Sequence, residues 1–157
     1  MESFLSYKIL SKNRLILANF QYKVQTRDVK VLTLKYMEDP LYNPDYNLLM
    51  DFSDSLAIIF KLELHDYLDF FKKLVRLTSI LKVAILFTSP NHEFLIKIYK
   101  AMAKLFKMDV EKFKEVNSAL SWLGLPIKDF VPIDSHLMQI KYQTNVELYD
   151  VSTNGHI

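Results

Sequence analysis

The residues best placed for chemistry are the carboxylates Asp51 and Asp54. They follow a strand expected over residues 46–51, and open α/β sheets bind ligands at the carboxyl ends of their strands. Short carboxylates also commonly bond the backbone of a turn, and no base, nucleophile or oxyanion donor stands beside these two. We therefore favour a structural role over a catalytic one. If this region binds a ligand or a partner, the residues expected to do so are Asp51, Ser53, Asp54 and Ser55.

Other reactive side chains are scarce. The best acid–base candidate is His92, beside Glu93 at an expected helix start, and none of the four histidines stands at the spacing of a metal site: His65, His92, His136 and His156. The chain has no cysteine, which excludes disulfides and thiol nucleophiles. Its two glycines are too few for a dinucleotide-binding or P-loop motif. We predict no catalytic residues, no metal, no cofactor and no enzymatic activity.

Charge and hydropathy limit the partners. Four lysines line one side of a helix expected over residues 93–106: Lys97, Lys100, Lys104 and Lys107. They could meet phosphate, but lysines toward a helix C-terminus also complement the helix dipole, and we interpret them as a solvated face. With a net charge of +2, no nucleic-acid partner is predicted. The apolar runs are far shorter than the roughly 20 residues that span a bilayer, so we expect a cytoplasmic protein without a membrane span.

The elements that must position these residues follow from hydrophobic periodicity and chain breakers. Strands are expected over residues 7–10, 15–22, 46–51, 82–88 and 110–113, the first two forming a hairpin. Helices are expected from Thr26 to before Pro40, over 63–77, 93–106 and 119–123, the last ended by Gly124. Residues 83–87 are apolar throughout, which is typical of a central strand covered on both faces. The alternation predicts an α/β fold with a mixed, mostly parallel sheet of about five strands and about four helices.

Two segments carry a family resemblance. Residues 39–51 (DPLYNPDYNLLMD) and 113–124 (FKEVNSALSWLG) resemble a turn-and-strand signature and a closing helix of small bacterial STAS-like proteins with the SpoIIAA-like fold. The resemblance covers roughly residues 5–124 and implies that fold, which is related to the lipid-binding lobe of Sec14-type proteins. In the anti-sigma-factor antagonists of this family, a serine after the third strand is phosphorylated. Here residues 60–63 contain no serine or threonine, and we expect no such switch.

The C-terminal part is treated separately. We divide the chain into a STAS/SpoIIAA-like domain, residues 1–124, and a C-terminal extension, residues 125–157. Apolar and β-branched residues alternate from Met138 to Leu148, which predicts a strand. This β arm or hairpin would pack on its own sheet edge or on a partner subunit, most simply in a homodimer. A helix capped by Asp134 is the third alternative, disfavoured by Thr144 and Val146.

The resemblance and the missing catalytic set point to one leading function. We expect a non-catalytic regulatory or protein-interaction domain whose partner is another, unidentified protein. The alternative is a binder of a small apolar or lipid-like ligand, suggested by eleven Phe and nine Tyr and by the Sec14-like relationship.

Overall fold

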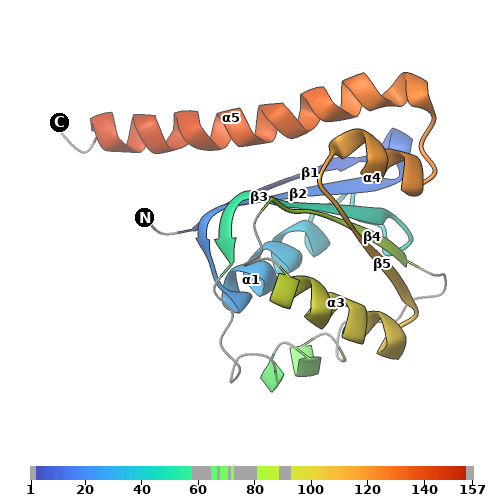
Figure 1. Cartoon of the computed structure of the whole chain (residues 1–157). Helices are drawn as coiled ribbons and strands as arrows, with labels where there is room; N and C mark the ends of the chain where they lie inside the picture. The colour runs from blue at the N-terminus through green and yellow to red at the C-terminus, as the bar shows by residue number, and fades with distance from the viewer. Residues whose placement is uncertain are drawn as a thin grey trace.

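The computed structural model describes residues 3–57, 65–66, 68–70, 72, 81–88 and 93–154. A mixed sheet of five strands lies between two layers of helices (Figure 1). The strands are β1 (Phe4–Leu10), β2 (Leu15–Val24), β3 (Asn47–Ala57), β4 (Leu81–Leu86) and β5 (Met108–Phe113). The helices are α1 (Thr26–Met37), α3 (Glu93–Leu105), α4 (Val116–Trp122) and α5 (Phe130–Asn154), with short 3-10 turns η1 (Ser11–Asn13) and η3 (Ile127–Asp129).

The strands lie side by side in their chain order, β1-β2-β3-β4-β5. β1 pairs with β2 in the antiparallel direction, and the other three pairings are parallel. The predicted hairpin is confirmed: η1 and Arg14, which adopts the left-handed conformation at φ 51°, connect its strands. The predicted mixed, mostly parallel sheet is confirmed as well.

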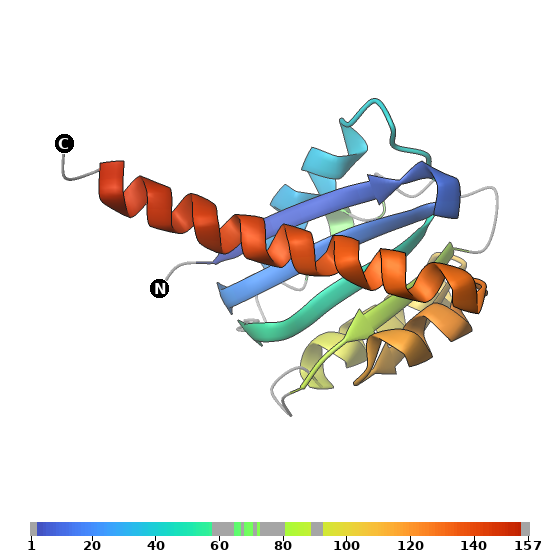
Figure 2. The ribbon, with the colours of Figure 1, turned by 90° about the horizontal axis from the view of Figure 1, so that it is seen from above.

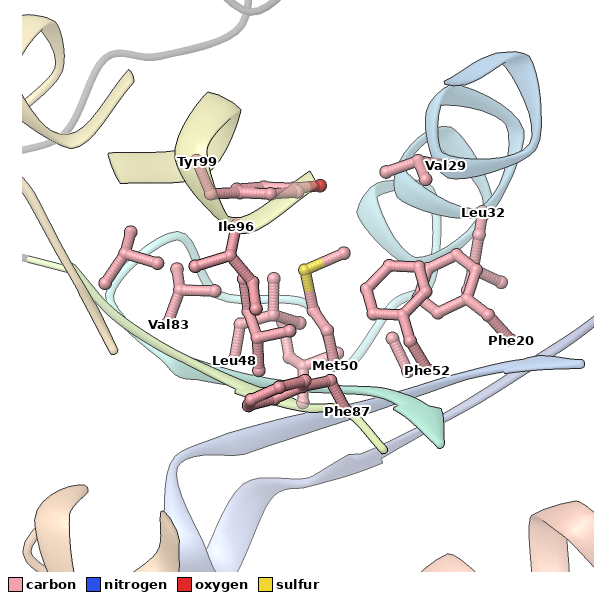
Figure 3. Close-up of a cluster of buried hydrophobic side chains, with 14 of the residues drawn as sticks. Phe20, Val29, Leu32, Leu48, Met50, Phe52, Val83, Phe87, Ile96 and Tyr99 are labelled. Atoms are coloured by element: carbon pink, nitrogen blue, oxygen red, sulfur yellow. The ribbon is translucent and has the colours of Figure 1, made fainter. Parts of the chain in front are cut away.

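Each face of the sheet carries its own hydrophobic core. Under α1 and α3, the rings of Phe20 and Phe52 stack at 4.3 Å between centroids, and Ile96 and Tyr99 cover the neighbouring strands (Figure 3). The opposite face packs against α4 and α5, with Leu17, Leu49 and Ala84 of the sheet in contact with Leu120, Ile133 and Leu137. β4 is covered on both sides as predicted, because Val83 and Ile85 belong to the first core and Ala84 and Leu86 to the second.

Several element boundaries differ from the predictions. Gln25, not Thr26, caps α1, and its backbone N donates to Asp28 Oδ2 at 2.7 Å. The helix ends at Met37, before Pro40 as predicted. β3 continues past Asp51 to Ala57, so the strand is longer than predicted. The predicted helix over residues 63–77 lies largely outside the described residues, but 65–66, 68–70 and 72 are helical.

The predicted C-terminal β arm is wrong, because this segment forms the helix α5 and is not extended. Ile133, Leu137 and Ile140 are spaced by four and three residues and are buried together on the sheet. Only Ile140 belongs to both patterns, because Met138 and Tyr142 of the alternation are exposed on the helix. The low helix propensity of Thr and Val costs only about 0.5 kcal/mol per residue, less than burying one aliphatic side chain contributes. Gly124 ends α4 at φ 83°, as predicted.

A candidate site beneath the C-terminal helix

α5 crosses the sheet diagonally above β1 and β2 (Figure 2). In addition to the buried side chains of Ile133, Leu137 and Ile140, two polar contacts hold α5 on the sheet. Ser6 Oγ of β1 donates to the carbonyl oxygen of Ile140 at 3.4 Å, and Lys8 Nζ lies 2.9 Å from Nδ1 of His136. These contacts fix the rotation of α5 about its axis, and this rotation brings Lys141 over β3.

A row of polar residues crosses the sheet under α5. Ser6 on β1, Asn19 on β2 and Asp51 on β3 are in register with one another. Asn19 and Asp51 are buried, and Asn19 Nδ2 donates to Ser6 Oγ at 3.4 Å. Asn19 Oδ1 is buried without a hydrogen-bond partner among the described residues. On this face of the sheet, Leu17 and Leu49 are followed two residues later by the polar Asn19 on β2 and Asp51 on β3.

A β-bulge shapes β3 at this point. Asn19 pairs with Asp51 and Gln21 with Asp54, so two residues of β2 correspond to three of β3. The extra residue lets Ser53 turn back on Asp51: its backbone N donates to Asp51 Oδ1 at 2.9 Å and its Oγ at 2.5 Å. Thr88, just past the end of β4, donates from Oγ1 to the carbonyl oxygen of Ser53 at 2.9 Å. The bulge is thereby fixed at the carboxyl end of β4.

Lys141 completes the site. Its Nζ lies 2.6 Å from Asp51 Oδ2, 3.3 Å from Ser53 Oγ and 3.5 Å from Asp54 Oδ2. The side chain of Asp51 is 1% exposed, that of Lys141 17% and that of Asp54 60%. Apart from Lys141, no described group donates a hydrogen bond to Asp51 Oδ2. The ammonium of Lys141 therefore neutralises a buried carboxylate oxygen that would otherwise be uncompensated.

The surrounding carboxylates keep Lys141 in its charged form. Burial by itself would lower the pKa of Lys141, but the charges and hydrogen bonds of Asp51 and Asp54 outweigh it and raise the pKa above its usual value. A raised pKa favours the ammonium form of Lys141, which donates through its three N–H groups. The cluster resembles a catalytic dyad in its residue types, but its charge state suits a receptor for an ammonium group.

The structure brings together three of the four predicted site residues. Asp51, Ser53 and Asp54 surround Lys141, inside β3 and not after it as predicted. Ser55 is buried apart from them, and its Oγ donates to the carbonyl oxygen of Phe52 at 2.8 Å. The sequence pattern does not point to Lys141, because the alternation from Met138 to Leu148 predicts a strand there and not the helix α5. The sequence signal for this role is the position of Lys141 directly after Ile140. A charged side chain at the edge of a buried helix face lies close to the sheet.

The other candidates lie outside this site. His136 contacts Lys8, His65 is exposed, and His92 and His156 lie outside the described residues. The predicted lysine face is exposed, and Lys100 pairs with Glu111 at 3.5 Å. In the described part of the chain, no group of three His, Cys, Asp or Glu side chains converges as metal ligands would. Among the same residues, no helix combines the length and apolar character needed to cross a membrane.

Comparison with known proteins identifies the fold. No protein-family model matches the sequence, and no curated protein matches it either. Among solved structures, an uncharacterized protein of the DUF3478 family from Shewanella loihica PV-4, which has a SpoIIAA-like fold, aligns with a TM-score of 0.52. The alignment covers 77% of this chain and 93% of that chain, at 15% sequence identity. This chain has a SpoIIAA-like fold.

The resemblance seen in residues 39–51 and 113–124 is therefore confirmed at the level of fold. In this SpoIIAA-like domain the first segment forms the turn into β3, and the second forms the end of β5, α4 and Gly124. Residues 60–63, where the related antagonists carry a phosphorylated serine, lie outside the described residues. At this level of identity the likeness concerns the fold and carries no activity, ligand or partner.

Proposed function

We propose that this SpoIIAA-like domain is a non-catalytic regulatory domain that binds another protein through the outer face of α5 and also forms a homodimer. The observation that carries the proposal is a stripe of exposed apolar side chains on η3 and α5. Their exposed fractions are 82% for Ile127, 79% for Val131, 57% for Met138 and 71% for Tyr142. At 100° per residue, Val131, Met138 and Tyr142 fall within about 40° of one another around the helix.

Such a stripe favours a protein partner. Large apolar side chains gathered on one exposed face are typical of protein-interaction surfaces. Methionine and tyrosine suit such surfaces, since Met adapts its shape and Tyr combines apolar area with a hydroxyl group. The alternative, a lipid-like ligand, would need apolar space inside the domain. The aromatic residues that suggested it, among them Phe20, Phe52 and Tyr99, pack against one another and their neighbours in the described core (Figure 3).

The buried ion pair supports the same role. A buried charge pair adds little net stability compared with an apolar pair of similar size. It does penalise any rotation or shift of α5 that would separate Lys141 from Asp51. The pair therefore fixes which face of α5 points outward, and a regulatory surface needs such a fixed orientation.

The test compares a stripe variant with a matched control. The double variant Val131→Glu/Met138→Glu places charges on the stripe, and Leu41→Glu places one on a similarly exposed leucine in the turn before β3. Each protein is used as bait in a lysate of the native host, and retained proteins are identified by mass spectrometry. We expect wild type and Leu41→Glu to retain the same protein and the stripe variant to lose it.

Two results would contradict this proposal. Equal capture by the folded stripe variant would exclude the outer face of α5 as the binding surface. A lipid that co-purifies stoichiometrically with wild type in native mass spectrometry would favour the alternative function. Circular dichroism of all variants establishes that they are folded. Light scattering of the full chain over a dilution series tests the homodimer separately.

A further inference from the structure

α5 and β1 contact each other with matched spacing. Ser6 of β1 contacts Ile140 of α5. Two residues further along β1, Lys8 contacts His136, which lies four residues earlier on α5. Two strand residues span about 6.6 Å and four helix residues about 6 Å, so the two rows of side chains stay in step. Leu10 continues the row into the core under α4 and α5. The geometry of both elements therefore places His136 against Lys8.

The contact between Lys8 and His136 requires a neutral histidine. Lys8 Nζ lies at hydrogen-bond distance, 2.9 Å, from His136 Nδ1. A lysine ammonium has three N–H donors and no acceptor, so Nδ1 must be the acceptor and the imidazole proton must be on Nε2. A protonated imidazolium carries N–H groups on both nitrogens and cannot accept this hydrogen bond. It would also place a second positive charge directly beside the ammonium.

The acidic groups around this contact do not compensate a second positive charge. Among the described residues, neither Lys8 nor His136 pairs with a carboxylate. Asp134 is on α5 itself, but it lies about 200° around the helix from His136. Asp129 of η3 accepts a hydrogen bond from Asn13 Nδ2 at 3.2 Å.

The other neighbouring elements add no free acid. The β2 residues that face α5 next to this contact are the aliphatic Leu15 and Leu17. The remaining titratable groups on β3 and in the turn after β1 are already paired or are exposed cations: Asp51 and Asp54 with Lys141, and Lys12 and Arg14. A proton on the histidine would therefore leave two cations facing each other.

We propose that the contact between Lys8 and His136 is an acid-sensitive latch, which opens when His136 takes up a proton and loosens the part of α5 around it from β1. Histidine ordinarily changes its charge between about pH 5 and pH 8. The protonated ring loses its hydrogen bond from Lys8 and repels the ammonium at the same time. Lys141, whose pKa is raised, stays charged throughout this range, so α5 remains held at β3. The latch concerns the hold of α5 on the sheet and does not depend on the proposed partner.

Amide hydrogen exchange measures the latch. The amides of residues 134–141 in the full chain are compared at about pH 7.5 and about pH 5.5, on either side of the ordinary titration of histidine. Exchange is expressed as protection factors, which remove the intrinsic effect of pH on the exchange rate. In wild type, the protection factors should fall by about tenfold at the lower pH, the loss expected for one hydrogen bond of this kind.

Two variants remove the pH response in different ways. In His136→Gln, the amide oxygen can still accept from Lys8 but does not titrate, so protection should agree within about twofold at the two pH values. Lys8→Met keeps an aliphatic side chain and removes the ammonium, so the response to pH should be lost as well. Lys12→Met, on an exposed lysine in the turn after β1, is the matched control and should respond as wild type does. The other histidines are common to all four proteins, so their protonation cancels in the comparison.

Each outcome decides for or against the latch. A response that is lost in His136→Gln and Lys8→Met and kept in Lys12→Met supports it. Wild-type protection that is the same at both pH values overturns it. A response that persists in Lys8→Met also overturns it, because another titrating group would then be responsible. Circular dichroism at both pH values establishes that the proteins are folded, and if Lys8→Met is not, the comparison of wild type with His136→Gln decides alone.

Discussion

Lys141 on α5 reaches Asp51 in the middle of the sheet, and the two charged atoms lie 2.6 Å apart with the carboxylate almost fully buried. The pair links the last helix to the bulge in β3. Four measurements test this pair and the fold around it.

The first concerns the charge balance of the site. Lys141→Met leaves Asp51 buried and uncompensated, so it should lower the free energy of unfolding by about 3–5 kcal/mol. Replacing both partners, Asp51→Asn with Lys141→Met, should cost clearly less than Lys141→Met alone. Urea unfolding measures each value. Lys97→Met, on an exposed lysine of α3, is the control and should change stability by less than about 0.5 kcal/mol. A double variant as unstable as the single one would argue against charge compensation.

A second prediction concerns Asn19. Its Oδ1 is buried without a partner among the described residues, and such a group costs about 1–3 kcal/mol. Asn19→Val removes that oxygen and suits a strand, while Ser6 Oγ keeps its bond to Ile140. The variant should be as stable as wild type or more stable by up to about 1 kcal/mol. A clear loss of stability in urea unfolding would mean that Asn19 Oδ1 has a partner in solution, such as a buried water molecule.

The free energy of unfolding at alkaline pH should depend on the ionisation of Tyr36. Burial raises the pKa of Tyr36 from 10.0 to about 12. The folded state thus holds this proton more tightly than the unfolded state, so the associated stability is complete below pH 10 and is lost as pH rises toward 12. Lys141, whose pKa is also raised, adds to the same loss above its ordinary value of 10.5. Tyr36→Phe should flatten the fall of unfolding free energy across this range. An unchanged slope would contradict the raised pKa.

The final measurement uses the single tryptophan. Trp122 is half-buried, 5.6 Å from the ring of Phe113 between centroids, and the Lys82 ammonium lies 5.2 Å from its ring centroid. Because the indole is only partly buried, Trp122→Ala should cost about 2–3 kcal/mol, below the 3–5 typical of a fully buried ring. Trp122→Phe should recover part of the loss. A change below about 0.5 kcal/mol in urea unfolding would show that the indole contributes little to holding α4.

The sequence predicts those parts of the fold that are determined by residues close together along the chain. The polar residues 11–14 between the first two expected strands, Pro40 after α1 and the apolar run in β4 each indicate a structure that forms. Asp51, Ser53 and Asp54 are predicted together because they are close in sequence and come at the end of the strand expected over residues 46–51, although β3 continues past them to Ala57. Lys141 could not be found in this way, since its role depends on α5 crossing β1 and β2 so that its side chain reaches Asp51 on β3. For α5, burial of one helical stripe on the sheet decided the conformation, and that sheet face is assembled from β1 to β4.

The chain order of the sheet has a consequence during synthesis. Every strand that α5 covers is made before α5, and ribosomes add roughly 5–20 residues per second, so several seconds separate Asp51 from Lys141. During that interval Leu17 and Leu49 of the nascent sheet are exposed to water, and the carboxylate of Asp51 stays hydrated. A newly completed α5 therefore meets a sheet face that is already assembled, and its docking is the step that takes Leu17, Leu49 and Asp51 out of water.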